Sequence, residues 1–281
     1  MNILLNNSIT LSALLNGGNF IIQGVTGLGL ADIRTSSFLY SGRSGGLVTD
    51  QLLGFRIITI TGIIGQNDGT QVQHATDRKA LIAALPLGTT VPVYITTFSG
   101  ETYRIDVNVT DAKVEYRQRG FTSDFFIQLT AGDPLFYSTD GGDIQSAIVT
   151  LQAQTGGYTT PYDLPVDWAA GATPSTVLNS GNATIFPIIE LHDEAHDPII
   201  TNQTTGETFA LSISMADGDV IEIDMGNRTV TLNGSSIMGN RVDGNTWWGL
   251  TPGNNSIVLT SDTSDDNVYA DIMWRNGVTG I

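Results

Sequence analysis

The chain has 281 residues, of which 41% are hydrophobic and 14% are charged; it contains 32 glycines and no cysteine, and its formal net charge is −16. At roughly 150 residues per domain the length suggests two domains, and the many glycines with little charge predict many turns and few helices. The lack of cysteine excludes thiol catalysis, zinc–thiolate sites and disulfides. The lack of clustered Lys and Arg argues against a phosphate backbone as the main ligand.

The negative charge is concentrated in the second half of the chain. Residues 1–140 hold 9 Lys+Arg and 11 Asp+Glu, whereas residues 141–281 hold 3 and 17, so the halves carry −2 and −14. A solvated, highly soluble domain explains this acidity. The low overall charge content suggests that partner subunits cover part of the surface, because solubility normally relies on charged surface.

The N-terminal stretch MNILLNNSITLSALLNGG has no basic region, and Asn and Ser interrupt its apolar residues. It therefore fits neither a signal peptide nor a membrane span. We expect no membrane insertion, and assembly in a cytoplasm.

Dense runs of β-branched and aromatic residues predict that the first half is mainly sheet. The expected strands are FRIITITGII (55–64), VPVYITTF (91–98), TYRIDVNVTDAKVEY (102–116) and DFFIQLTA (124–131).

One helix is expected within TDRKALIAALPLG (76–88), with Thr76 or Asp77 as the N-cap and with Pro86 followed by Gly88 as the stop. The face expected to pack on the sheet consists of Leu81, Ile82 and Leu85.

Residues 138–183 are rich in Gly, Thr, Ser and Pro and form the expected boundary region, with IQSAIVTLQA (144–153) as a strand inside it. After residue 182, eight short strand-like runs alternate with turn residues, which favours a β-sandwich. The runs are IFPIIEL, PIITNQT, TFALSIS, DVIEIDM, TVTLNG, WWGL, SIVLTS and VYADIMW. The predicted domains are residues 1–140 and 141–281.

DVIEIDMGNRTVTLNG (219–234) predicts a hairpin. Alternation directs Val220, Ile221 and Ile223 partly into a core, and the chain reverses at residues 225–227. Val230 and Leu232 are then expected to enter the same core. Asn233-Gly234 then supplies the positive φ values of a second tight turn.

HDEAHD (192–197) places His192 and His196 four residues apart, which resembles the H-E-x-x-H zinc signature with Asp193 in place of Glu. That signature works on a helix, whereas this segment follows a strand-like run and ends at Pro198. A loop between two strands is therefore expected, and no metal site is predicted.

Other chemistry has little support in the sequence. Asp219, Glu222 and Asp224 flank a predicted strand, and a solvated strand face explains them better than a pair of glycosidase carboxylates. No G-x-S-x-G elbow or G-x-x-x-x-G-K-[ST] loop occurs, and GLGL (27–30) is only turn-like. We therefore predict no catalytic residue, no cofactor and no enzymatic activity.

Trp247 and Trp248 are the candidate contacts for a ligand or a partner. In a sandwich, adjacent residues point to opposite faces, so one ring is expected in the core and the other half exposed. Packing in a core or subunit interface is favoured over stacking on a sugar.

Three pieces of the sequence resemble the siphophage distal tail protein (Dit) family. They are A-G-D-P-L-F-Y (131–137), D-x-x-x-R-T-V-x-L-N-G (224–234) and L-x-P-G-x-N (250–255), and the order of strands and helix agrees along nearly the whole chain.

The resemblance implies a mainly β protein, with a β-sandwich-like, ring-forming N-terminal domain that carries one helix, and a galectin-like C-terminal β-sandwich. It implies a non-enzymatic homohexameric ring, single or stacked, at the tail tip of a virion. The implied partners are the tail tube, the tail-tip hub and receptor-binding or adaptor proteins, while DNA passes the channel without specific binding. The sugar-binding motif of galectins, H-x-N-x-R followed by W-x-x-E, is absent from the sequence.

Two other functions remain open from the sequence. A carbohydrate-binding module or adhesin would use the C-terminal sandwich and its tryptophans, and a secreted glycosidase would use some of the abundant acids.

Overall fold

The computed structural model describes residues 1–13, 19–65, 71–117, 122–151, 174–262 and 268–281. The chain forms two compact units, Met1–Asp143 with Val278–Ile281, and Ile144–Gly277. The sequence alone placed the last four residues in the second domain. In the structure they belong to the first, because the side chains of Val278 and Ile281 pack against its core. Part of the predicted boundary region, residues 152–173, lies outside the described residues.

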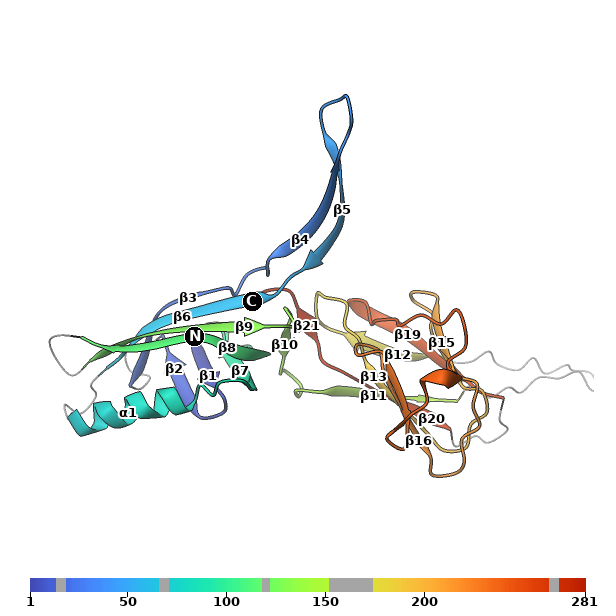
Figure 1. Cartoon of the computed structure of the whole chain (residues 1–281). Coiled ribbons are helices and arrows are strands. Elements are labelled where there is room, and N and C mark those ends of the chain that lie inside the picture. Colours follow the sequence, from blue (N-terminus) through green and yellow to red (C-terminus); the bar gives the residue numbers. More distant parts are fainter. Residues whose placement is uncertain (14–18, 66–70, 118–121, 152–173, 263–267) are drawn as a thin grey trace, which may run out of the picture. The chain divides into compact units, whose positions relative to one another are not determined.

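The first unit is a nine-stranded sheet with one helix and a separate hairpin (Figure 1). The sheet order is β21-β10-β8-β7-β1-β2-β3-β6-β9. The elements are β1 (Asn2–Leu5), β2 (Ile9–Ser12), β3 (Phe20–Thr26), β4 (Ile33–Leu39), β5 (Gly46–Leu53), β6 (Arg56–Ile64), α1 (Gln71–Ala83), β7 (Thr90–Thr96), β8 (Thr102–Tyr116), β9 (Ser123–Ala131), β10 (Phe136–Ser138) and β21 (Gly277–Val278).

The long strand β8 folds this sheet back on itself. Its first half, residues 102–108, pairs with β7, and its second half, residues 108–116, pairs with β9. Because β2 also pairs with β3, the pairing runs in a closed circle, β8-β7-β1-β2-β3-β6-β9, around a common core. A mainly β arrangement with one helix is as predicted. The four strands predicted in this half are confirmed as β6, β7, β8 and β9.

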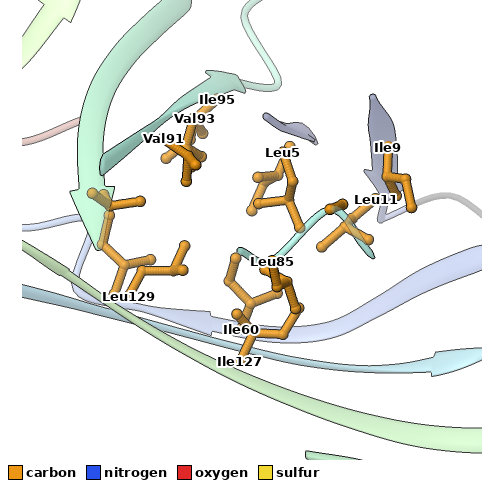
Figure 2. Packing of buried hydrophobic residues seen from close by; sticks show 14 of the residues in the cluster. Leu5, Ile9, Leu11, Ile60, Leu85, Val91, Val93, Ile95, Ile127 and Leu129 are labelled. Atoms are coloured by element: carbon orange, nitrogen blue, oxygen red, sulfur yellow. The ribbon is translucent and has the colours of Figure 1, made fainter. Parts of the chain in front are cut away.

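The core of the first unit is built from alternate residues of these strands, with one face of α1 added. β6 and β9 alternate strictly between buried and less buried positions, as a strand with one face in a core must. Figure 2 shows Leu85, from the turn after α1, in one cluster with Leu5, Ile60 and Ile127.

The predicted helix exists but differs in its start and its buried face. It begins by Gln71, so Thr76 and Asp77 lie inside it and the predicted N-cap is wrong. The hydroxyl of Thr76 donates to the carbonyl of Val72 one turn earlier, and Asp77 accepts from the side chain of Asn19.

Leu81 is 0% exposed and Leu85 is 7% exposed, which confirms the prediction that they bury the helix. Ile82 is 50% exposed, so its predicted place on that face is wrong. It follows Leu81 by one residue, and one residue turns the helix by about 100°. The stop is confirmed, because the helix ends at Ala83 and Gly88 has a φ of +75°.

The second unit consists of two antiparallel sheets, ordered β11-β20-β13-β16-β17-β18 and β12-β19-β14-β15. Each buries one face, as in a β-sandwich. The strands are β11 (Gln145–Thr150), β12 (Ser175–Asn179), β13 (Ile188–His192), β14 (Ile199–Asn202), β15 (Glu207–Ala210), β16 (Val220–Asp224), β17 (Thr229–Leu232), β18 (Ser235–Ser236), β19 (Gly253–Thr260) and β20 (Tyr269–Trp274), with a short 3-10 helix at Met238–Asn240.

Of the runs predicted as strands after residue 182, WWGL is wrong. Only Leu250 pairs there, through an isolated bridge to Ile185. The other seven runs contain strands, and the strand expected within 144–153 is confirmed as β11. Within the described ranges, no helix is both long and apolar enough to span a lipid bilayer.

The predicted hairpin is confirmed as β16–β17. Ile223 pairs with Val230, and both are fully buried. The carboxylate of Asp224 accepts from the backbone N–H groups of Gly226 and Asn227, so it closes the turn. The second turn has φ values of +49° at Asn233 and +79° at the following glycine, as Asn-Gly predicts.

Candidate functional site

A hairpin outside the nine-stranded sheet carries seven of the fifteen large exposed apolar residues described in the first unit. Strands β4 and β5 pair only with each other and form a two-stranded sheet, which extends away from the rest of this unit in Figure 1. We call residues 33–53 the arm. An isolated two-stranded hairpin is marginally stable in water, so the arm requires something to cover it.

The apolar side chains of the arm are open to solvent. Every residue of β4 is exposed, including Phe38 at 65% and Leu39 at 88%. Phe38 pairs with Leu47, and Leu39 next to it points to the opposite face. Both faces near the tip are therefore apolar, as in strands that are buried on two sides. The large exposed apolar residues of the arm are Ile33, Phe38, Leu39, Tyr40, Leu47, Val48 and Leu52.

The tip of the arm is a compact turn. The N–H of Tyr40 donates to the carbonyl of Gly45 at 3.1 Å, and the guanidinium of Arg43 lies 3.9 Å from the centroid of the Tyr40 ring. Gly42 and Gly45 have φ values of +75° and +101°, which favour glycine. The sequence of the tip therefore favours this turn through local contacts alone.

A groove of about 440 Å³ lies beside α1, between the end of the helix and the second half of β8. Exposed Ile82 and Leu87 border it together with buried Leu85 and partly buried Val109. The groove thus offers an apolar surface on the same unit that bears the arm.

The two candidate tryptophans differ in exposure, as predicted for adjacent residues. Trp248 is 1% exposed, so its ring is part of the core. Trp247 is partly exposed; its ring lies 4.7 Å from that of Phe209, and the guanidinium of Arg241 lies 5.6 Å from its centroid. Only Trp247 offers surface to a ligand or partner of the single chain.

The HDEAHD segment is a loop, as predicted. His192 is the last residue of β13 and stacks on Tyr269 with a centroid distance of 4.7 Å. The Nδ1 atom of His196 shares a hydrogen bond of 2.7 Å with the hydroxyl of Ser214. Because the segment is not helical, the two imidazoles lack the common helix face that H-E-x-x-H needs. In the described part of the chain, no three His, Asp or Glu side chains gather in a way that could hold a metal ion.

The acids around β16 stabilise turns. Asp219 accepts hydrogen bonds from the backbone N–H of Ala216 and from the side chain of Asn233, which hold the pKa of its carboxyl below the usual value. Glu222 is exposed on the solvent face of the strand. These contacts explain the carboxylates without a substrate.

Comparison with known proteins shows which protein family the chain resembles. Residues 180–277 match the family model described as the C-terminal domain of the siphovirus-type tail component. The distal tail protein of Bacillus phage SPP1 is 24% identical over 250 residues, which cover 87% of each chain. Residues 180–277 therefore carry the C-terminal domain of this siphovirus tail family. The similarity to the distal tail protein extends over most of the chain, so it includes the first unit as well as the second.

The fold agrees with this similarity. The crystal structure of the SPP1 Dit protein aligns over 98% of each chain with a TM-score of 0.68 and 17% sequence identity. That protein is described as a paradigm of the hub adsorption apparatus in phages that infect Gram-positive bacteria. At this identity the likeness concerns the fold.

The strands of the arm were not predicted from the sequence. They lack the strict alternation that marks a half-buried strand, because both of their faces are exposed. The turn sequence SGRSGG (41–46), flanked by apolar and β-branched residues, was the available signal for a hairpin.

Proposed function

We propose that this chain is a non-enzymatic structural subunit of a phage tail tip. Six copies form a ring, single or stacked, that joins the tail tube to the tail-tip hub and anchors receptor-binding or adaptor proteins. The C-terminal unit, as a galectin-like sandwich, holds those outer proteins. Assembly takes place in the host cytoplasm, and DNA passes the channel without specific binding.

The exposed arm is the observation that carries the proposal. Phe38, Leu39 and Val48 are exposed to water on the hairpin. Monomeric soluble proteins rarely expose apolar patches of this kind, which mark protein interfaces. When one surface of a subunit contacts a different surface of the next, the contact is heterologous, and copies related by a closing rotation form a ring. An arm on the first unit meets this condition.

Two further features support a passive ring. The first unit holds 9 Lys+Arg and 12 Asp+Glu and carries −3, whereas the second holds 3 and 16 and carries −13. Acidic surface repels a DNA backbone rather than binding it. The carboxylates around β16 are engaged in turns, which argues against a glycosidase.

Assembly of the purified full-length chain tests this function. Mass photometry and negative-stain images should reveal six-membered rings, alone or after addition of the tail tube and hub proteins. Substitution of the cross-strand pair, Phe38→Ser with Leu47→Ser, should leave monomers with an unchanged far-UV circular dichroism spectrum. Phe98→Ser is the matched control, because Phe98 is 80% exposed in the first unit but lies outside the arm.

Two results would contradict the proposal. A wild-type chain that stays monomeric even with its tail neighbours would remove the ring. Rings formed equally well by the Phe38/Leu47 variant would show that the arm does not mediate assembly.

A carbohydrate-binding role for the second unit is the other candidate, and the partly exposed Trp247 beside Arg241 favours it. A glycan array should then give signals that Trp247→Ala abolishes. Absence of binding to every glycan would eliminate this role while leaving the ring untouched.

A further inference from the structure

Arg56, the first residue of β6, is buried at the base of the arm. Its side chain is 1% exposed, and its guanidinium carbon lies 4.2 Å from the centroid of the Phe136 ring. Burial lowers the pKa of this guanidinium, while the nearby carboxylate of Asp133 acts in the opposite direction. A buried cation is costly unless hydrogen bonds compensate for the lost water.

Backbone carbonyls supply those hydrogen bonds. Nη1 donates to the carbonyls of Gly27 and Gly29 at 2.7 and 2.5 Å. Nε donates to Pro134 at 2.6 Å, and Nη2 donates to Thr279 at 2.7 Å. We call Arg56 with these four carbonyls the Arg56 clamp. The planar fork of arginine makes this possible, because its donors point in several fixed directions.

The Arg56 clamp joins the chain segment just before the arm to the residue just after it. Gly27 and Gly29 belong to the segment between β3 and β4, and Arg56 follows the last residue of β5 after two residues. Between them, the N–H of Gly54 donates to the carbonyl of Asp32 at 2.6 Å and closes the base of the hairpin. Both strands of the arm are therefore connected, within a few residues, to backbone that Arg56 holds in place.

The C-terminal segment completes the clamp. The N–H of Ile281 donates to the carbonyl of Leu28 at 2.9 Å. Gly280 lies so close to this segment that a Cβ on it would be 3.0 Å from the carbonyl carbon of Gly29 and 3.3 Å from the carbonyl oxygen of Leu28. The segment that follows the second unit thus packs on the backbone from which the arm starts.

We propose that residues 278–281 are a latch that fixes the base of the arm through the Arg56 clamp. While the latch is closed, the carbonyl of Thr279 occupies one branch of the guanidinium fork, and residues 27–29 are held between Arg56 and Gly280. When the latch opens, the arm base loosens. Val278 directly follows Gly277, the last residue of the second unit. A displacement of Gly277 would therefore be transmitted through the chain to the latch. This inference concerns one chain and stands whether or not rings form.

Hydrogen–deuterium exchange of the full chain tests the latch in two independent ways. Arg56→Lys replaces the fork with a single ammonium that cannot serve four carbonyls. Gly280→Ala leaves Arg56 intact and places a Cβ 3.0–3.3 Å from the backbone of residues 28 and 29, which must give by a few tenths of an ångström. Arg104→Lys and Gly132→Ala are the matched controls in the same unit, because Arg104 contacts Asp106 and Asp143, and a Cβ on Gly132 meets nothing within 4 Å.

Peptides covering residues 27–33 and 53–56 should exchange roughly tenfold faster in Arg56→Lys, as expected for the loss of charge-assisted hydrogen bonds. Gly280→Ala should raise the rate by roughly threefold or more, in line with a forced backbone contact. The controls should exchange like the wild type, as should peptides from β9 in every variant. Samples are compared at a concentration where light scattering gives the same mass for all of them.

Wild-type exchange at the arm base in both variants would overturn the latch. Faster exchange confined to residues 278–281 would also overturn it, because the segment would then be held without holding the arm. If Arg56→Lys unfolds the whole first unit, Gly280→Ala decides the question by the same criterion. A monomeric wild type with a latched arm would contradict the ring and leave the latch standing.

Discussion

Removal of the Leu81 side chain gives a direct test of how the helix packs on the first unit. Leu81 is 0% exposed and belongs to the core cluster that includes Ile60 and Ile127. Leu81→Ala deletes the three carbons beyond Cβ, which at about 0.8 kcal/mol each amounts to roughly 2.4 kcal/mol. The cavity left behind adds to this, so we expect a loss of about 3 kcal/mol within the usual range of about 2–5 kcal/mol. Leu85 borders the groove beside α1, where the site collapses more easily, so Leu85→Ala should fall nearer the lower end of that range.

This loss should appear in the unfolding of the first unit. For a domain of this size, each kcal/mol lowers the Tm by about 2–4 °C, so Leu81→Ala should lower it by about 6–12 °C. Thermal scans by circular dichroism follow both units, whereas tryptophan fluorescence follows the second alone. Every tryptophan lies within residues 144–277, namely Trp168, Trp247, Trp248 and Trp274.

Ile82→Ala is the matched control, because Ile82 is the next residue and is 50% exposed. It should change stability by less than about 0.5 kcal/mol. Equal Tm shifts for Leu81→Ala and Ile82→Ala would refute the assignment of the buried helix face. A Leu81→Ala variant without any shift would show that the helix is not packed on the sheet.

Two predictions concern turns of the second unit. Hydrogen bonds from Ala216 and Asn233 hold the pKa of Asp219 below its usual value, so their stabilising effect is complete above the unfolded pKa near 4 and is lost as the pH falls through the lower folded pKa. Asp219→Asn should therefore flatten the loss of stability between about pH 5 and pH 2, measured by urea unfolding with tryptophan fluorescence, and a pH profile identical to wild type would count against it. Gly234→Ala should cost about 1–2 kcal/mol in the same assay because Gly234 has a φ of +79°. Gly239→Ala, whose Cβ would meet nothing within 4 Å, should cost less than about 0.5 kcal/mol, and similar losses for both would contradict the turn argument.

Strands with one buried face could be predicted from the sequence, because burial imposes a period of two. β6 and β9 fulfil this condition along their whole length, and so does the β16–β17 hairpin, where Asn233-Gly234 also fixes the turn. The strands of the arm do not have one buried face, because the first unit buries neither of their faces. A strand with both faces exposed in its own chain gives no alternating pattern to detect.

Tertiary contacts explain the other differences. The helix start was misplaced because Asp77, a residue typical of N-caps, instead bonds to Asn19 from inside the helix. Trp248 is core without being in a strand, since only Leu250 pairs in that segment. Arg56 occupies the inward phase of β6 together with Ile58 and Ile60, so a charged residue in that phase was the available signal for a buried clamp.

The division of the first unit along the chain sets the order in which its contacts can form during synthesis. The ribosome makes residues 1–143 first, then residues 144–277, and only afterwards Val278 and Thr279. The described strands of the second unit are therefore made before the Arg56 clamp has the acceptor that Thr279 provides. If the proposed latch holds, the base of the apolar arm is fixed only after the second unit has been made.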